Sequence, residues 1–315
     1  MRNVSIGDSL AAKRQLSRKT STTLQCYIML ALPIIGFFVF TLYPILWSFR
    51  WSLFAYNGVA HEARFVGLDN FISVFTKDAA YWTSWKNTIL FAVLKLALEI
   101  PLAMILALIL NQRFKLTGFY RSVYYLPSVV SVAIIGLVFS NMFNYFGIIN
   151  ALLQNLGLIA EPIDWLADRE KAIMVIVIAS AWNTFGVNTM YILAALTGVP
   201  REVYEAARLD GASPTRTFFS ITLPLIIPVF QTVLLLAMLG SLSINDFILT
   251  LTGGGPSGST HSVMSHMTRQ FVPGFTENAR PAIGYGCAMS LTTTVILSFI
   301  TVGYKRLANY LKEKY

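Results

Sequence analysis

Six apolar stretches, each long enough to cross a bilayer as a helix, constrain this chain more than any other feature. The hydrocarbon core of a bilayer is about 30 Å thick and a helix rises about 1.5 Å per residue, so about 20 apolar residues span it. Only 12% of the 315 residues are charged, against about 25% in soluble domains. The sequence therefore predicts an all-α polytopic membrane protein with six transmembrane helices, near residues 26–49, 88–110, 122–143, 172–194, 220–244 and 283–303.

The distribution of lysine and arginine predicts the orientation of these helices. Of the 24 basic residues, fifteen lie in the two tails and in the second and fourth connections between spans, and eight lie in the other three connections. Because cytoplasmic segments carry the excess of Lys and Arg, both termini and the connection after 194 are expected in the cytoplasm. The net charge of +9 thus fits membrane orientation and contact with anionic lipid rather than nucleic-acid binding.

The same pattern divides the chain into three parts. Residues 1–25 form a basic N-terminal tail, 26–305 a transmembrane domain, and 306–315 a C-terminal tail. The first apolar stretch begins too late and is too long for a signal peptide. Cys26 and Cys287 both fall in apolar segments, so neither a disulfide framework nor a thiolate metal site is expected.

The polar connection near residues 200–219 has a helix–turn–helix pattern. Pro200 suits a helix start, and alanines favour helix over 201–210. Gly211 supplies the left-handed residue that ends this helix. Ser213 and Pro214 are an N-cap and first-turn pair that begins a second helix, which continues into the fifth span. Pro224 and Pro228 are expected to bend the start of that span.

The spacing in this connection resembles a known family. Glu205-Ala206-Ala207, then Gly211, then Ile221-Thr222-Leu223-Pro224 read EAA-x3-G-x9-I-x-LP, which resembles the coupling loop of permease subunits from binding-protein-dependent ABC importers. Trp165-Leu166-Ala167-Asp168 and Leu251-Thr252-Gly253-Gly254-Gly255-Pro256 look like sequences around that loop in sugar-type permeases. The resemblance covers roughly residues 26–305. It is closest to the carbohydrate-uptake group, in particular to the first permease subunit of maltose-type and glycerol-3-phosphate-type systems.

The resemblance implies a fold, partners and a function. The fold would be that of a type I ABC importer permease (MetI/MalF-like), in a bacterial or archaeal cell membrane. The partners would be a second homologous permease, two ATP-binding cassette subunits and an external solute-binding protein. ATP and Mg would bind to the ATPase subunits, so this chain would hold no cofactor and would not be an enzyme. The coupling residues would be Glu205, Ala206, Ala207, Asp210, Gly211, Ser213 and Pro214.

Polar and aromatic residues inside the fourth and fifth spans are the expected substrate path. Hydroxyl and amide groups match sugar hydroxyls, and an indole face packs on the C–H face of a sugar ring. The alternative is hydrogen bonding between helices, which Ser, Thr and Asn commonly provide in membranes. The residues are Ser180, Trp182, Asn183, Thr184, Ser241, Ser243, Asn245 and Asp246.

Other polar features are expected to be structural. Gly253–Thr260 nearly spells a phosphate-binding loop, but Ser259 replaces the required lysine and no strand precedes it. His61, His261 and His266 are expected in outer loops without metal-ligand spacing, and no catalytic constellation can be assembled. Lys95 and Glu99 stand four residues apart inside the second span. A mutually neutralising pair is favoured over a proton relay there.

Overall fold

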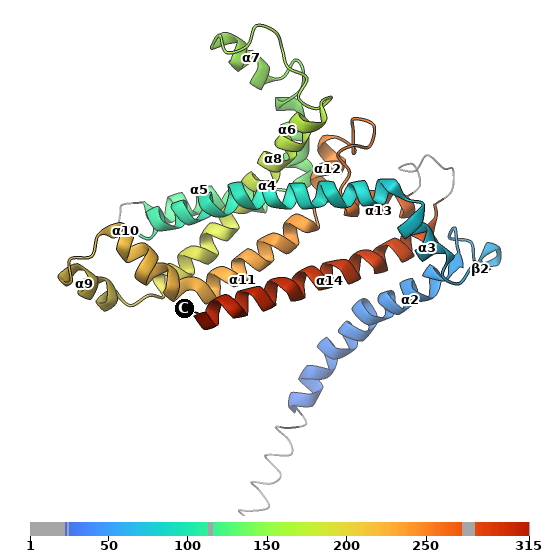
Figure 1. Cartoon of the computed structure of the whole chain (residues 1–315), viewed down its shortest axis with the longest axis horizontal. Helices are drawn as coiled ribbons and strands as arrows, with labels where there is room; N and C mark the ends of the chain where they lie inside the picture. The colour runs from blue at the N-terminus through green and yellow to red at the C-terminus, as the bar shows by residue number, and fades with distance from the viewer. Residues whose placement is uncertain (1–22, 24, 113–115, 273–280, 315) are drawn as a thin grey trace, which may run out of the picture.

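The structure is a bundle of long helices that share one long axis. It is a computed structural model, and it describes residue 23 and residues 25–112, 116–272 and 281–314 (Figure 1). The predicted tail 1–25 lies outside the described residues apart from Thr23 and Gln25. Within these described ranges, five helices are long and apolar enough to cross a membrane: Gln25–Ser52, Ala79–Leu110, Arg169–Thr197, Pro214–Leu242 and Ile283–Tyr310.

The elements follow one another in a simple order. The first span contains a π-helical turn, η1 (Phe38–Leu42), and α2 (Tyr43–Ser52). A small hairpin of β1 (Phe54–Ala55) and β2 (Arg64–Phe65), with the 3₁₀ turn η2 (Ala60–Glu62) between its strands, follows. The remaining helices are α3 (Asp69–Thr76), α4 (Ala79–Leu110), α5 (Thr117–Val129), α6 (Val132–Met142), α7 (Ile148–Asn155), α8 (Arg169–Thr197), α9 (Arg201–Leu209), α10 (Pro214–Thr217), η3 (Phe218–Thr222), α11 (Leu223–Leu242), α12 (Asp246–Leu251), α13 (Val263–Phe271) and α14 (Ile283–Lys314).

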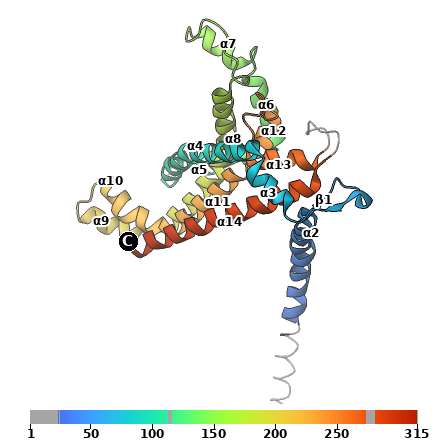
Figure 2. The same cartoon turned by 45° about the vertical axis from the view of Figure 1, so that its right-hand side comes forward.

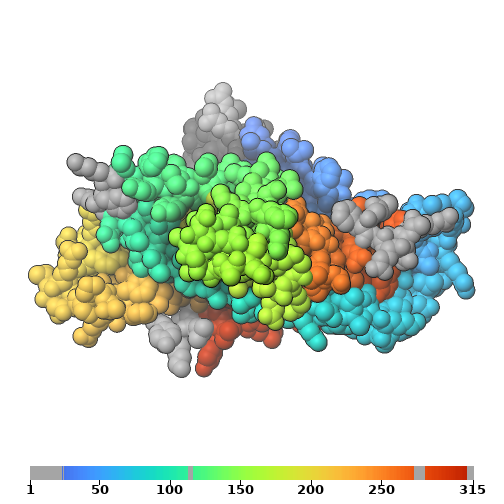
Figure 3. Space-filling view, turned by 90° about the horizontal axis from the view of Figure 1, so that it is seen from above, coloured from blue at the N-terminus to red at the C-terminus, as the bar shows by residue number. Residues whose placement is uncertain are grey.

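The two ends of the bundle differ. In Figure 1, α9 and α10 lie at one end together with the C-terminal end of α14, and α3 with the β-hairpin lies at the other end. The segment of α6 and α7 rises away from the long axis, and the first span diverges from the bundle, as Figure 2 also shows. Seen from above in Figure 3, the segment around α7 stands over the middle of the molecule, between the yellow α9–α10 end and the light-blue hairpin end.

The third predicted span, 122–143, is not one straight helix. α5 and α6 are separate helices that meet at 92°, because Val130 and Ser131 are extended after the last turn of α5. Pro127 lies in that turn and cannot donate a backbone hydrogen bond. Asn183 of α8 donates to the carbonyl of Pro127 at 2.8 Å. α6 then packs against α12 and not in line with α5.

Two other predicted boundaries moved outward. α4 begins at Ala79 rather than near residue 88, because the Asp78 side chain caps it by accepting from the amide of Tyr81 at 2.8 Å. Its first turns are rich in aromatic and polar side chains, which conceal them in a hydropathy profile. α14 continues as a helix to Lys314, so the predicted C-terminal tail 306–315 is helical as far as it is described.

Three apolar clusters hold the bundle together. One joins α4, α6, α8 and α12 around Phe91, Ile176 and Ile248. The second joins α4, α8 and α11 at the α9–α10 end, and the third joins α3, α4, α13 and α14 at the hairpin end. α4 and α8 take part in the first two clusters, so this pair is the centre of the fold.

α5 lies close to α8 because of one glycine. A Cβ on Gly186 of α8 would fall on the backbone carbonyl of Tyr124 in α5, well inside van der Waals contact. Small residues of this kind allow helix backbones to approach closely in membranes.

We therefore expect Gly186→Ala to separate α5 from α8 and to lower the thermal midpoint of the protein in mild detergent. Overpacking of this kind costs about 1–3 kcal/mol. Gly240→Ala is the matched control, since Gly240 also lies in a helix but has no heavy atom within 4 Å of the added Cβ. Equal midpoints for the two variants would contradict the close packing.

Candidate functional site: the coupling segment and the intramembrane path

The connection between the fourth and fifth spans folds as the sequence predicts. α9 covers Arg201–Leu209, with Pro200 extended immediately before it. Gly211 has φ +71°, and the amides of Gly211 and Ala212 donate to the carbonyls of Arg208 and Ala207 at 3.1 and 2.9 Å. This pair of bonds is a Schellman motif, which needs a left-handed residue at the glycine position. We call residues 200–217 the coupling segment.

The second helix of the coupling segment begins as expected and runs into the fifth span. The Ser213 hydroxyl accepts from the amide of Arg216 at 3.3 Å, and Pro214 occupies the first turn of α10. The five-residue π turn η3 follows, in which the amide of Leu223 donates to the carbonyl of Phe218. Pro224 follows Leu223 and has no amide to donate. That Pro224 and Pro228 bend the start of the span stays a prediction. Helix is continuous from Pro214 to Leu242.

The coupling segment presents an exposed helix face. Of the predicted residues, Glu205, Ala206, Asp210, Gly211, Ser213 and Pro214 are exposed, whereas Ala207 is buried. Leu209 is 89% exposed and stands four residues after Glu205, on the same face. A large apolar side chain this exposed, beside a carboxylate, suits contact with another protein. Leu209 is not part of the motif, but the sequence alone shows that it stands one helical turn after Glu205.

The ionisable pair in the second span is buried between helices. Glu99 is fully buried, and its Oε2 lies 3.7 Å from the Lys95 ammonium. Asn188 of α8 donates to Glu99 Oε1 at 2.6 Å. The pair therefore faces α8, as expected for mutual neutralisation, and Asn188 adds a polar bridge between α4 and α8 that the sequence pattern does not reveal.

The predicted path residues of α8 are largely occupied by contacts within the bundle. Ser180 is buried and donates to the carbonyl of Val177, and the buried Asn183 donates to that of Pro127. Thr184 donates to the carbonyl of Ser180 at 3.0 Å. Trp182 is 43% exposed and packs its ring 5.7 Å from that of Phe139. Among these four, the indole is the most exposed.

The predicted path residues near the end of α11 are more open. Ser241 is buried and donates to the carbonyl of Ala237, but Ser243 and Asp246 are exposed. The Asn245 amide donates to the Asp246 carboxylate at 2.9 Å. Across the part of the chain that the structure describes, no hydrogen bond joins this group to the α8 group. That both groups line one solute path stays a prediction.

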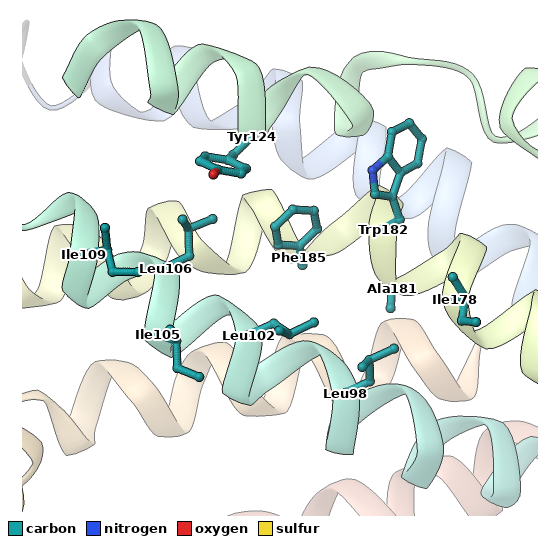
Figure 4. Close-up of a pocket in the computed structure, with 10 residues that line it drawn as sticks. All are labelled: Leu98, Leu102, Ile105, Leu106, Ile109, Tyr124, Ile178, Ala181, Trp182 and Phe185. Carbon is teal, nitrogen blue, oxygen red and sulfur yellow. The ribbon is translucent and has the colours of Figure 1, made fainter. Parts of the chain in front are cut away.

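A cavity of about 530 Å³ opens among α4, α5 and α8. Figure 4 shows that its walls are aliphatic and aromatic, with Trp182 and Phe185 of α8 facing Leu102 of α4 and Tyr124 of α5. Trp182 is the one predicted path residue in its lining. A sugar needs hydrogen-bonding partners, so this apolar cavity alone does not provide a sugar site.

His261 and His266 lie in the connection between the last two spans, as expected, and both are buried there. His266 lies in α13, with its Nε2 3.5 Å from the Asp78 carboxylate, which also accepts from the Tyr285 hydroxyl at 2.8 Å. The Nδ1 of His261 lies 3.0 Å from the Ser265 hydroxyl. In the described ranges, no group of three or more His, Cys, Asp or Glu residues could hold a metal ion.

The Gly253–Thr260 loop is a closed turn. The amides of Gly254 and Gly255 donate to Thr252, and the amide of Thr260 donates back to Gly254. The Asn87 amide of α4 donates to the carbonyls of Ser259 and His261 at 2.8 and 2.9 Å. These amides are thus engaged inside the loop, which agrees with a turn rather than a phosphate cradle.

Comparison with known proteins identifies the family. Residues 99–314 match the family described as binding-protein-dependent transport system inner membrane component. The chain belongs to this family. A trehalose/maltose transport system permease protein of Thermococcus litoralis is 34% identical, over 91% of this chain and 94% of the relative. A lactose transport system permease protein of Rhizobium radiobacter is 33% identical, over 83% and 88%.

The solved structures agree on the fold. A chain of a bacterial ABC transporter involved in the import of alginate superposes with a TM-score of 0.76, at 21% identity, over 95% of this chain and 99% of that one. By its family the protein is a multi-pass membrane permease component of a transport system, and it has the predicted permease fold.

Lys95→Met is expected to destabilise this permease by about 3–5 kcal/mol, because it leaves the Glu99 carboxylate buried without a cation. The double variant Lys95→Met/Glu99→Gln removes both charges and should regain most of the stability, as measured by thermal unfolding in detergent. It should also retain solute uptake in cells. A stable double variant without uptake would contradict a structural role and favour a relay.

Stability is expected to fall in acid in part through His261. Burial lowers the pKa of His261 from 6.5 to about 4, with Arg269 and His266 adding to the effect. The unfolded chain therefore binds a proton in this window that the folded chain does not, so this contribution is complete above about pH 6.5 and is lost toward pH 4.

Thermal melts between pH 7 and 4.5 measure this effect. His261→Gln keeps a polar side chain near Ser265 and removes the titration, so its midpoint should fall less steeply with acid than that of the unaltered protein. Parallel curves for the two proteins would contradict the assignment.

Proposed function

We propose that this permease forms, together with a homologous second permease, the translocation path of an ATP-driven importer for a sugar, oligosaccharide or related polyol. The similarity to proteins named for trehalose/maltose, lactose and arabinooligosaccharide transport supports the substrate class. The exposed Ser243 and Asp246, and the Trp182 indole, are the side chains of the expected path that remain open to a solute.

The coupling segment is the observation that carries the proposal. It is a rigid helix–turn–helix with an exposed face around Glu205 and Leu209, and its second helix continues without interruption into the fifth span. Two ATP-binding cassette subunits would bind this face, with Glu205 paired to a basic residue and Leu209 in an apolar pocket. Those subunits would bind ATP and Mg, and this chain would bind neither.

The first span supports the presence of a second permease. In the apolar 18-residue window of Gln25–Ser52, no residue is buried within the chain. In the corresponding windows of the other four spans, 28–61% of the residues are buried. A helix that leaves its own bundle needs another partner in the membrane, and the second permease, together with lipid, would supply it. An external solute-binding protein would deliver solute at the hairpin end.

In this proposal, the coupling segment and both termini lie in the cytoplasm of a bacterial or archaeal cell, as the excess of Lys and Arg in these segments supports. Closure of the ATPase subunits on ATP would move the two coupling segments together. The helical bundles would then rock, so that the central path opens alternately outward and inward. Because α10, η3 and α11 are continuous, displacement of the coupling segment is transmitted directly into the bilayer.

Two alternative functions are transport of a non-sugar solute and ion-coupled transport. A permease of this family for a non-sugar solute would use the same coupling segment and differ only in the path. An ion-coupled transporter would need Lys95 and Glu99 to exchange protons with solvent, but Lys95 is nearly buried, and Glu99 is fully buried and accepts a hydrogen bond from Asn188. Within the described residues, no structural feature favours either alternative.

The experiment is a charge reversal in the coupling segment. Glu205→Lys should abolish co-purification of the ATPase subunits from detergent extracts and reduce uptake at least ten-fold, while the permease stays folded. Glu170→Lys makes the same charge change at an exposed position on the opposite end of the bundle and should alter neither. Unchanged ATPase association and uptake with Glu205→Lys would refute the coupling assignment.

Gly211→Val tests the same surface through backbone geometry. Nothing lies within 4 Å of an added Cβ there, so the variant acts through the left-handed φ, which a β-branched residue strongly disfavours. We expect loss of ATPase association without a change in membrane insertion.

A further inference from the structure

A second cavity, distinct from the coupling segment and from the cavity beside Trp182, lies between α11 and α14. It measures about 290 Å³ and combines apolar and polar walls. Pro228 and Leu235 of α11 contribute apolar surface, and Lys305 and Asn309 of α14 contribute an ammonium and an amide. We call it the α11–α14 groove. Its composition differs from that of the cavity near Trp182, which is almost entirely apolar.

Hydrogen bonds between the two helices fix the shape of the groove. The Tyr304 hydroxyl donates to the carbonyl of Gln231 at 2.7 Å, and the Gln231 amide donates to the carbonyl of Ala308 at 3.0 Å. Each helix thus bonds to the backbone of the other. The groove is therefore a built feature of the α11–α14 contact and does not depend on flexible side chains alone.

The groove lies at the depth of a lipid head group. Lys305 is the first charged residue of α14 and comes 22 positions after Ile283. At about 1.5 Å per residue this separation is about 33 Å, close to the thickness of the hydrocarbon core. Lys305 therefore falls at the membrane boundary. The C-terminal end of α14 lies on the same side of the bundle as α9 and α10 (Figure 1).

The positive charge of Lys305 is not compensated within the described part of the chain. It forms no ion pair there, α11 has no acidic residue, and the one acidic residue of α14 is Glu313. The side-chain amide of Asn309 makes no hydrogen bond with any described residue either. The Lys305 ammonium and the Asn309 amide are therefore two donors beside apolar surface, which suits a negatively charged ligand with acceptor oxygens.

We propose that the α11–α14 groove binds the phosphodiester head group of an anionic phospholipid. The Lys305 ammonium and the Asn309 amide bind the phosphate oxygens, and Leu235 and Pro228 contact the upper part of the acyl chains. Basic groups at a membrane surface attract anionic lipids in this way. The bound lipid bridges α14 and α11, the helix that continues from the coupling segment, and stabilises their contact.

Lipid retention by the purified importer tests this proposal, with phosphatidylglycerol as the probe. The complex is reconstituted with equal amounts of phosphatidylglycerol and phosphatidylcholine, extracted in mild detergent, and its bound lipids are counted by native mass spectrometry. The unaltered protein should retain phosphatidylglycerol preferentially. Lys305→Gln should reduce that retention about five-fold, and Asn309→Ala should reduce it by a smaller factor.

Arg306→Gln is the matched control. Arg306 is exposed, carries the same charge and is adjacent in sequence, but it does not line the groove. Its retention of phosphatidylglycerol should stay within two-fold of the unaltered protein. If Lys305→Gln and Arg306→Gln lost equal amounts of retained phosphatidylglycerol, general surface charge would explain the retention and the proposal would be overturned.

Two further arms identify the source of the phosphate. Inorganic phosphate at millimolar concentration should not displace the lipid, and displacement would assign the groove to a free anion instead. Equal retention of phosphatidylcholine and phosphatidylglycerol would show that the groove does not select an anionic head group, and would overturn the proposal. The absence of retained lipid would assign the groove to a partner subunit or to detergent, and would overturn it too.

Discussion

The contact between α4 and α8 is the interaction on which the rest of the structure depends. These two helices share the first two apolar clusters and are joined by the Glu99–Asn188 hydrogen bond. α8 also carries Gly186, which allows α5 to pack closely against it. Asn183 of α8 donates a hydrogen bond to the carbonyl of Pro127, just before the bend between α5 and α6. Because lipid provides no hydrogen-bonding partners, each of these polar groups must be satisfied within the bundle.

That constraint explains why so many polar side chains of the spans are structural. Ser180, Thr184 and Ser241 each donate to a carbonyl of their own helix, and Asn87 holds the Gly253–Thr260 loop against α4. Polar residues in a membrane helix thus mark internal hydrogen bonding at least as often as a solute path. The charged groups with open donors lie instead at the ends of the helices, in the coupling segment and in the α11–α14 groove.

Part of this picture could be predicted from local sequence. The coupling segment needed only short-range signals, since Gly211 must be left-handed and Ser213 with Pro214 must start a helix. The break between α5 and α6 was harder, because a proline inside an apolar stretch is compatible with a kinked but continuous span. Its 92° angle depends on the packing of α6 on α12, where Gly136 meets Thr250. The sequence shows a leucine at position 209, but it does not predict that this side chain is exposed.

The sequence by itself determined that the chain spans a membrane with several helices, that one connection is a helix–turn–helix, and which family it belongs to. These properties follow from hydropathy, from backbone preferences and from a motif, all of which act over a few residues. Only the tertiary structure decided which polar side chains are satisfied inside the bundle, which helices are bent or unpaired, and where cavities open. Those outcomes depend on contacts between residues far apart in the sequence, such as Glu99 and Asn188 or Tyr304 and Gln231, which meet only when the helices are fully packed.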